Sequence, residues 1–203
     1  RSSDLDKSIK KRLLHTISEY CTWEYPGLVI RPGLCDLIEP MVSLDPLYIV
    51  DENIKLLECV KSKWNETYQS RLRYGIINDN CEKIFKYIPE QQLGLVFTAD
   101  FFNFKPLEVI KKYINEIFNI LRPGGILIFT YNNCNLANAV RNFEHFLYSY
   151  TPGTLVMPMI ELIGFEVLNT FNDPNSNTNW VTVKKPGTLT TQRGGQCLGK
   201  INI

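Results

Sequence analysis

Short apolar runs alternate with segments of helical periodicity through the first two thirds of this 203-residue chain. The apolar runs lie at 28–30, 47–50, 73–77, 93–98 and 126–130. Most of them are apolar on both faces, which is typical of strands in a parallel sheet that helices cover on both sides. Because crossovers between parallel strands are right-handed, the alternation predicts a doubly wound α/β sheet.

The intervening segments carry apolar residues three and four positions apart, as amphipathic helices do. The most regular of them is 106–121, with Pro106 in the first turn, where proline is tolerated. The turn 122–125 is expected to terminate that helix before the next strand. Further helices are expected at 4–23, 35–42, 54–68 and 82–88.

In the last third of the chain, the regular alternation of strands and helices ends. Residues 154–163 are expected to form a helix that ends at Gly164, and 136–150 a helix or a loop. Two strand candidates, 165–170 and 179–184, flank a loop rich in Asn, Asp, Pro and Ser, which is typical of an antiparallel pair. With these two strands, the predicted sheet has seven strands.

This pattern divides the chain into three parts. We expect an N-terminal helix at 1–24, an α/β domain at 25–185 and an extended tail at 186–203. The tail holds several Gly, Thr and Gln residues, and we expect it to contact another chain or domain.

Charge and cysteine content exclude several classes of function. The chain has 22 Lys and Arg against 21 Asp and Glu, so it lacks the broad positive charge typical of nucleic-acid-binding proteins. Its apolar runs are too short to cross a bilayer. The six cysteines are scattered and only two histidines occur, so no metal site is expected. We interpret the cysteines as reduced thiols of an intracellular, cytoplasmic protein.

Polar residues follow each predicted parallel strand, where open α/β sheets bind their ligands. They are Arg31, Pro32 and Gly33 after the first strand, Asp51 and Glu52 after the second, Asn78 and Asp79 after the third, Asp100 and Phe101 after the fourth, and Tyr131 and Asn132 after the fifth.

Each of these positions has a functional and a structural interpretation. The Asp51 carboxylate can accept both hydroxyl hydrogens of a ribose, or it can cap the next helix. Asp79 can accept from an adenine amine, or it can belong to a polar turn. Phe101 can line an adenine pocket or face a cation, or it can pack in the core. Tyr131 and Asn132 can line a substrate pocket, or they can form a surface turn.

Several catalytic motifs are absent from the sequence. It contains no phosphate-binding P-loop, no Gly-x-Ser-x-Gly elbow and no His-Glu-x-x-His pair. The glycine spacing also fails Gly-x-Gly-x-x-Gly, so a nicotinamide-dependent oxidoreductase is disfavoured.

Residues 25–185 together resemble class I S-adenosylmethionine-dependent methyltransferases. The resemblance rests on Leu47–Asp51, on the Leu-x-Pro-Gly-Gly turn at Leu121–Gly125, and on Gly164-Phe165-Glu166 before the final strand pair. It implies a Rossmann-like seven-stranded sheet in the order 3-2-1-4-5-7-6. The C-terminal block is also similar to phage-encoded methyltransferase-like proteins.

The resemblance implies S-adenosyl-L-methionine as cofactor and S-adenosyl-L-homocysteine as product. The turn through Pro32 and Gly33 would approach the methionine part, with Asp51 and Glu52 at the ribose. Asn78 and Asp79 would lie at the adenine edge, and Asp100-Phe101 beside the sulfonium. No single catalytic residue is implied, and the candidates are Asp100, Tyr131 and Asn132.

The first loop departs from the family pattern, acidic-x-Gly-x-Gly-x-Gly. The matching positions are Val29, Arg31, Gly33 and Cys35, so the acidic residue and two glycines are missing. The Arg31 side chain can fill the space of the methionine moiety, point away from it, or pair with the cofactor carboxylate.

Two functions follow as expectations. The first is methyl transfer to a small molecule or a protein side chain, since no Asn/Asp-Pro-Pro-Tyr/Phe tetrad of DNA amino-methyltransferases follows the fourth strand. The alternative is a catalytically inactive scaffold or binding module in a larger assembly such as a viral particle, which the altered loop favours.

Overall fold

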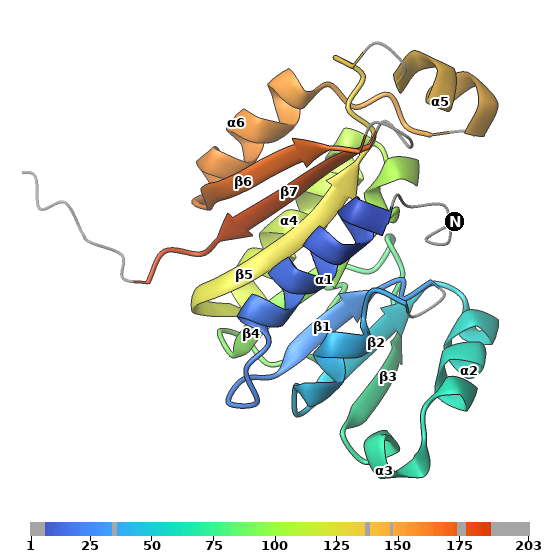
Figure 1. The fold of residues 1–203 in the computed structure, drawn as a ribbon. Helices are drawn as coiled ribbons and strands as arrows, with labels where there is room; N and C mark the ends of the chain where they lie inside the picture. The colour runs from blue at the N-terminus through green and yellow to red at the C-terminus, as the bar shows by residue number, and fades with distance from the viewer. Residues whose placement is uncertain (1–6, 34–35, 137–138, 147, 174–177, 188–203) are drawn as a thin grey trace, which may run out of the picture.

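The computed structural model describes residues 7–33, 36–136, 139–146, 148–173 and 178–187. Its centre is one seven-stranded sheet in the order β3-β2-β1-β4-β5-β7-β6 (Figure 1), which confirms the predicted order. β1 to β5 are parallel, and β7 runs antiparallel to both β5 and β6. The strands are β1 (Gly27–Ile30), β2 (Leu47–Asp51), β3 (Leu72–Ile76), β4 (Leu93–Thr98), β5 (Leu121–Tyr131), β6 (Glu166–Asn172) and β7 (Asn179–Lys184).

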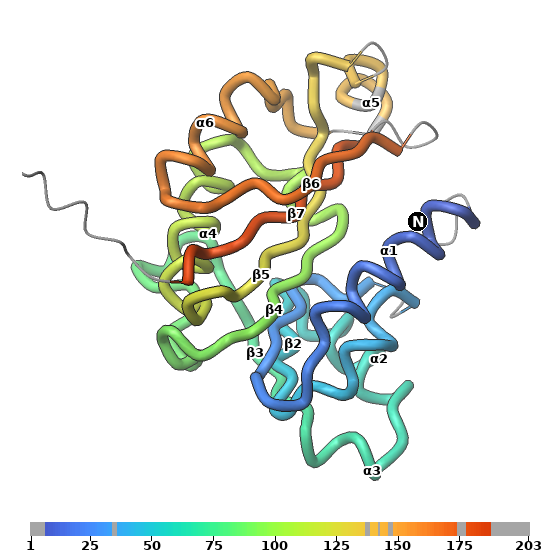
Figure 2. Tube along the Cα trace, turned by 60° about the vertical axis from the view of Figure 1, so that its left-hand side comes forward, coloured from blue at the N-terminus to red at the C-terminus, as the bar shows by residue number. Residues whose placement is uncertain are grey.

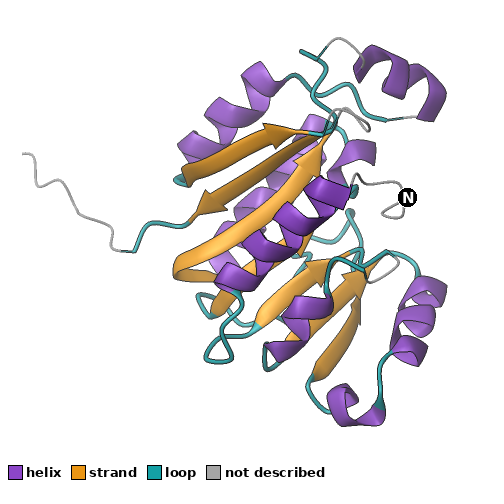
Figure 3. Ribbon diagram, in the orientation of Figure 1, coloured by secondary structure: helices purple, strands orange, loops and turns teal. Residues whose placement is uncertain are grey.

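Helices cover both faces of the sheet (Figure 3). The α-helices are α1 (Lys7–Tyr20), α2 (Ile54–Lys63), α3 (Glu66–Gln69), α4 (Leu107–Ile120), α5 (Ala139–Phe146) and α6 (Gly153–Ile163), and the 3-10 helices are η2 (Glu39–Ser43) and η3 (Phe102–Phe104). One face packs against α1, η2 and α2, and the opposite face against α4 and α6.

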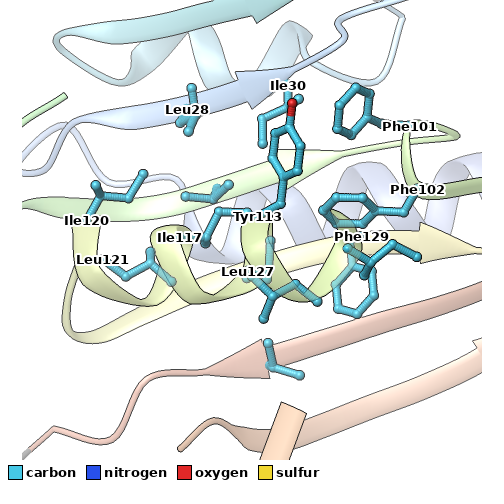
Figure 4. Close-up of a cluster of buried hydrophobic side chains, with 14 of the residues drawn as sticks. Leu28, Ile30, Phe101, Phe102, Tyr113, Ile117, Ile120, Leu121, Leu127 and Phe129 are labelled. Atoms are coloured by element: carbon cyan, nitrogen blue, oxygen red, sulfur yellow. The ribbon is translucent and has the colours of Figure 1, made fainter. Parts of the chain in front are cut away.

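The side chains of the central strands β1, β2, β4 and β5 alternate between two hydrophobic clusters. In β1, Leu28 and Ile30 belong to the cluster on the α4 side, whereas Val29 belongs to the cluster on the α1 side. Figure 4 shows the first cluster, in which Tyr113 and Ile117 of α4 lie among side chains from the strands. This alternation is the physical reason why the strands read as continuous apolar runs.

The predicted turn at 122–125 is wrong in one respect, because the structure continues β5 through it. Gly124 has a φ of +79°, and its N–H donates to the carbonyl of Lys185 at 2.8 Å. Lys185 donates in return to the carbonyl of Gly125 at 2.8 Å. Pairing with the segment after β7 therefore extends the strand beyond the apolar run.

The predicted helix at 54–68 is also wrong, since it is divided into α2 and α3. Trp64 has an extended backbone conformation, and Asn65 caps α3 by accepting a hydrogen bond from the N–H of Thr67. An Asn side chain that competes for backbone donors favours such a break. The predicted helix at 35–42 is replaced by η2, with Pro40 in its first turn; Cys35 lies outside the described residues.

Residues 82–88 form turns rather than the predicted helix. Ile84, Phe85 and Ile88 are buried, which explains their helix-like spacing. The N–H groups of Ile84 and Phe85 donate to the Glu116 carboxylate of α4 at 2.7 and 3.1 Å. A distant side chain therefore holds this segment in place of helical hydrogen bonds.

Glu116→Ala is expected to lower the free energy of unfolding by about 2 kcal/mol, because two buried N–H groups lose a charged acceptor. The measurement is urea denaturation. Glu161→Ala, on the exposed side of α6, is the control and should change stability by less than about 0.5 kcal/mol. Equal effects of the two substitutions would contradict this role of Glu116.

The N-terminal helix is confirmed over Lys7–Tyr20, and its Leu13 and Ile17 are buried against the sheet. The predicted tail at 186–203 lies almost wholly outside the described residues. Within the described ranges, no helix is long and apolar enough to span a membrane.

Candidate functional site

The carboxyl ends of β1 to β5 meet at one edge of the sheet, as the arrowheads in Figure 3 show. The loops that leave these strands carry the predicted site residues. A tube view from another side (Figure 2) shows α5 beyond the end of β5. Parallel pairing thus brings together residues that are about 100 positions apart in the sequence.

Asp51 ends β2 with its side chain buried, at 4% exposure. Its Oδ1 accepts a hydrogen bond from the N–H of Asn53 at 2.9 Å. Asn53, not Asp51, caps α2, so the helix-cap alternative for Asp51 does not hold. Asp51 Oδ2 is buried and has no hydrogen-bond partner in the described part of the chain. A buried acceptor without a donor costs free energy, which a donor from a ligand would offset.

Lys105, which was not among the predicted site residues, connects the loops after β2 and β3. Its Nζ lies 2.5 Å from Glu52 Oε1 and 2.6 Å from Asp79 Oδ2. The same ammonium lies 4.9 Å from the centroid of the Phe101 ring. Only 12% of the Lys105 side chain is exposed. A lysine between Phe104 and Pro106 belongs to no known motif, so nothing in the sequence predicted Lys105 as a site residue.

Asp79 uses both carboxylate oxygens within the protein. Tyr113 donates its hydroxyl to Oδ1 at 2.6 Å, and Lys105 donates to Oδ2. Burial would raise the pKa of Asp79, but the hydrogen bonds from Lys105 and Tyr113 outweigh it and lower this pKa. Burial and the neighbouring Asp79 strongly raise the pKa of Tyr113, so its hydroxyl remains a donor.

The stability that ionised Asp79 contributes should depend on pH. Because its folded pKa lies below the ordinary 3.8, the contribution is present above pH 3.8 and is lost as the pH falls through the folded value. We expect the difference in unfolding free energy between the wild type and Asp79→Asn to shrink from about pH 5 to about pH 2.

Urea denaturation at each pH measures this difference. Asp45→Asn is the control, because the Asp45–Arg71 pair is exposed and 3.9 Å long. A pH-independent difference for Asp79→Asn would show that the ionised form has no special stabilising role.

The other residues expected at the adenine edge serve the local structure. Asn78 is exposed, and its Oδ1 accepts from the N–H of Asn80 at 2.9 Å, as in a polar turn. Phe101 is buried and packs edge-on against Tyr113, with ring centroids 5.0 Å apart. Core packing therefore describes Phe101, although its ring also faces the Lys105 cation.

A cavity of about 330 Å³ lies at the ends of β1 and β4. This volume is at the lower end of the range for ligand sites. Predicted residues among its lining are Arg31, Pro32, Gly33 and Asp100, and the aromatic residues in it are Phe97, Phe104 and Tyr148. Asp51, Glu52, Asp79 and Lys105 are not among its lining residues.

Arg31 points into this cavity region rather than away from it. Its guanidinium carbon lies 4.9 Å from the centroid of Phe104, whose ring packs edge-on against Tyr148. Arg31 and Asp100 have φ values of +56° and +57°, in the left-handed region that residues other than glycine rarely occupy. Such strain concentrates at functional sites. Of the three described residues other than glycine with a positive φ, Arg31 and Asp100 line this cavity and Gln91 does not.

Asp100 is fixed from two sides. Its N–H donates to Thr130 Oγ1 at 2.7 Å, and its Oδ1 accepts from Asn103 Nδ2 at 2.9 Å. The strained backbone and these two hydrogen bonds hold the aspartate at the wall of the cavity.

Tyr131 and Asn132 are buried and do not line this cavity. The hydroxyl of Tyr131 accepts from Asn179 at 3.4 Å, and burial raises its pKa to about 12. Asn132 donates to the carbonyls of Ala139 and Ser149, at 3.3 and 3.2 Å. Tyr131 therefore contacts β7, whereas Asn132 supports the segments around α5, and neither forms the surface turn of the structural interpretation.

No family model and no curated protein matches the sequence. Among solved structures, an S-adenosylmethionine-dependent methyltransferase from Clostridium acetobutylicum aligns over 92% of this chain and 94% of its own, with a TM-score of 0.66 and 14% identity. One from Mesorhizobium loti aligns over 89% and 99%, with a TM-score of 0.66 and 10% identity. The [4+2]-cyclase SpnF aligns over 87% and 82%, with a TM-score of 0.66 and 12% identity.

These similarities extend over most of both chains in each comparison, and they agree with the observed strand order. The chain therefore has the class I methyltransferase fold that its sequence resemblance implied.

Proposed function

We propose that this protein transfers a methyl group from S-adenosylmethionine to an acceptor. The observation that carries the proposal is Asp51, a buried carboxylate at the end of β2 with one oxygen that lacks a donor in the described part of the chain. The two hydroxyls of a ribose are donors of the kind that this oxygen needs.

The polar residues at this edge match the separate chemical groups of the cofactor. Asp51 and Glu52 would hold the ribose, and Asp79 would accept a hydrogen bond from the adenine amine. Gly33 has a φ of +57°, and a Cβ added there would meet no heavy atom within 4 Å, which leaves room for the methionine part. Arg31 offers a guanidinium to the carboxylate of that part. The cofactor itself would supply an electrophilic methyl group on a cationic sulfur.

The protein's contribution to methyl transfer is mainly positioning, since the reaction is an in-line displacement. Asp100, held rigidly at the cavity wall, is the catalytic candidate that remains next to the cavity. The aromatic walls formed by Phe104 and Tyr148 suit a small molecule or a protein side chain as acceptor. With a net charge of +1, nucleic acid is not proposed as acceptor.

A cytoplasmic location is part of this proposal. The cysteines of the described residues, Cys21, Cys59, Cys81 and Cys134, are free thiols, which accords with a reducing compartment.

A second candidate function is that of a catalytically inactive scaffold. Arg31 favours it, because a guanidinium at the cavity wall brings positive charge towards the place of a sulfonium. The similarity to a [4+2]-cyclase also shows that this fold is not confined to proteins named methyltransferases.

Calorimetric titration with S-adenosylhomocysteine separates the two candidates. The methyltransferase proposal predicts saturable binding at one site per chain. Absence of heat at millimolar ligand would overturn it and leave the scaffold.

A further inference from the structure

We infer that Lys105 closes the adenosyl half of the site in the free protein, as an internal cation that the cofactor must displace. This inference rests on the proposed function and concerns how the same site is controlled. Glu52 and Asp79, the acidic residues expected at the ribose and the adenine, are both bound to one lysine.

The Lys105 ammonium has little freedom while it keeps its partners. It donates to two carboxylates at 2.5 and 2.6 Å and lies over the face of Phe101. Two charge-assisted hydrogen bonds and a cation–π contact stabilise a position that is largely excluded from water. An adenosine that used the same carboxylates would have to break these contacts.

Release of Lys105 requires only its side chain to move. The N–H of Lys105 donates to the carbonyl of Phe102 at 3.2 Å, as the end of η3, and α4 begins directly afterwards at Leu107. The backbone is thus anchored, whereas the four-carbon side chain can rotate. Asp79 keeps its hydrogen bond from Tyr113 when the lysine leaves, so the carboxylate stays in position.

Asp51 does not take part in this closure. Its Oδ1 is bound to Asn53, and its Oδ2 has no partner in the ranges that the structure describes. The free protein therefore neutralises Glu52 and Asp79 with Lys105 and leaves Asp51 for a ligand. Cofactor binding would exchange contacts of Lys105 for contacts of the adenosyl group, which lowers the net affinity.

The test compares the wild type with Lys105→Met, which keeps the approximate length of the side chain and removes its charge. Calorimetry should show that K105M binds S-adenosylhomocysteine about tenfold more tightly, the equivalent of about 1.4 kcal/mol. Lys83→Met is the matched control, because the Lys83–Glu90 pair is exposed and shares no residue with the ion pairs of Lys105. Lys105→Arg retains the cation and should bind like the wild type.

A salt series provides a test that needs no variant. Adenosine is uncharged, so salt acts on its affinity through the protein's own ion pairs. Affinity of the wild type for adenosine should rise with sodium chloride concentration, and affinity of K105M should remain constant.

The outcomes separate the inference from the proposed function. If neither protein binds S-adenosylhomocysteine, both are overturned. Equal affinities in wild type and K105M, or no salt effect on adenosine binding, would overturn closure by Lys105 alone. Weaker binding by K105M would overturn it too, and would make Lys105 a contact of the cofactor.

Discussion

Asp51→Asn is expected to weaken binding of S-adenosylhomocysteine about a hundredfold without loss of stability. The substitution removes the charge that would strengthen two hydrogen bonds to a ribose, a loss of about 3 kcal/mol. In the free protein the same carboxylate is buried with one oxygen unpartnered within the described residues. A neutral amide is less costly to bury, so the melting temperature should stay equal or rise.

Calorimetry and thermal denaturation of the same variant measure the two effects. Glu58→Gln, on the exposed surface of α2, is the control and should alter neither. If Asp51→Asn lowered stability and left affinity unchanged, Asp51 would be a structural residue and the proposed ribose contact would be wrong.

Leu127→Ala is expected to lower the free energy of unfolding by about 3 kcal/mol. Leu127 lies fully buried in β5, between β4 and β7, in the cluster that Figure 4 shows. Because strands flank it on both sides and helices pack on its face, the cavity left by the truncation has little means to collapse.

Leu162→Ala provides a matched control in α6, since the Leu162 side chain is 88% exposed. Urea denaturation should show a change below about 0.5 kcal/mol for this variant. Comparable losses for the two leucines would contradict the assignment of the core to the space between the sheet and α4.

The sheet could be predicted because burial on both faces leaves a plain signal in the sequence. The runs at 93–98 and 179–184 coincide with β4 and β7. Antiparallel pairing at the C-terminus followed from the polar loop between two short strands. Segments stabilised by distant groups were not predictable in this way. Glu116 organises 82–88 from α4, and Lys185 extends β5 through hydrogen bonds to Gly124 and Gly125.

The candidate site was predictable in position but not in its internal contacts. Strand ends placed Arg31, Asp51, Asp79 and Asp100 at one edge of the sheet, and the structure brings them there. The partners of these residues depend on packing. Lys105 reaches Asp79 across 26 positions, and the Tyr113 hydroxyl reaches it across 34. No local pattern encodes such contacts.

The central claim is that the edge after β2 binds an adenosyl group through Asp51. A crystal structure of the protein with S-adenosylhomocysteine tests it most directly. We expect the ribose hydroxyls within hydrogen-bond distance of Asp51 Oδ2, with the homocysteine part towards Gly33. A ligand bound at another place, with Asp51 Oδ2 still unpartnered, would contradict the claim.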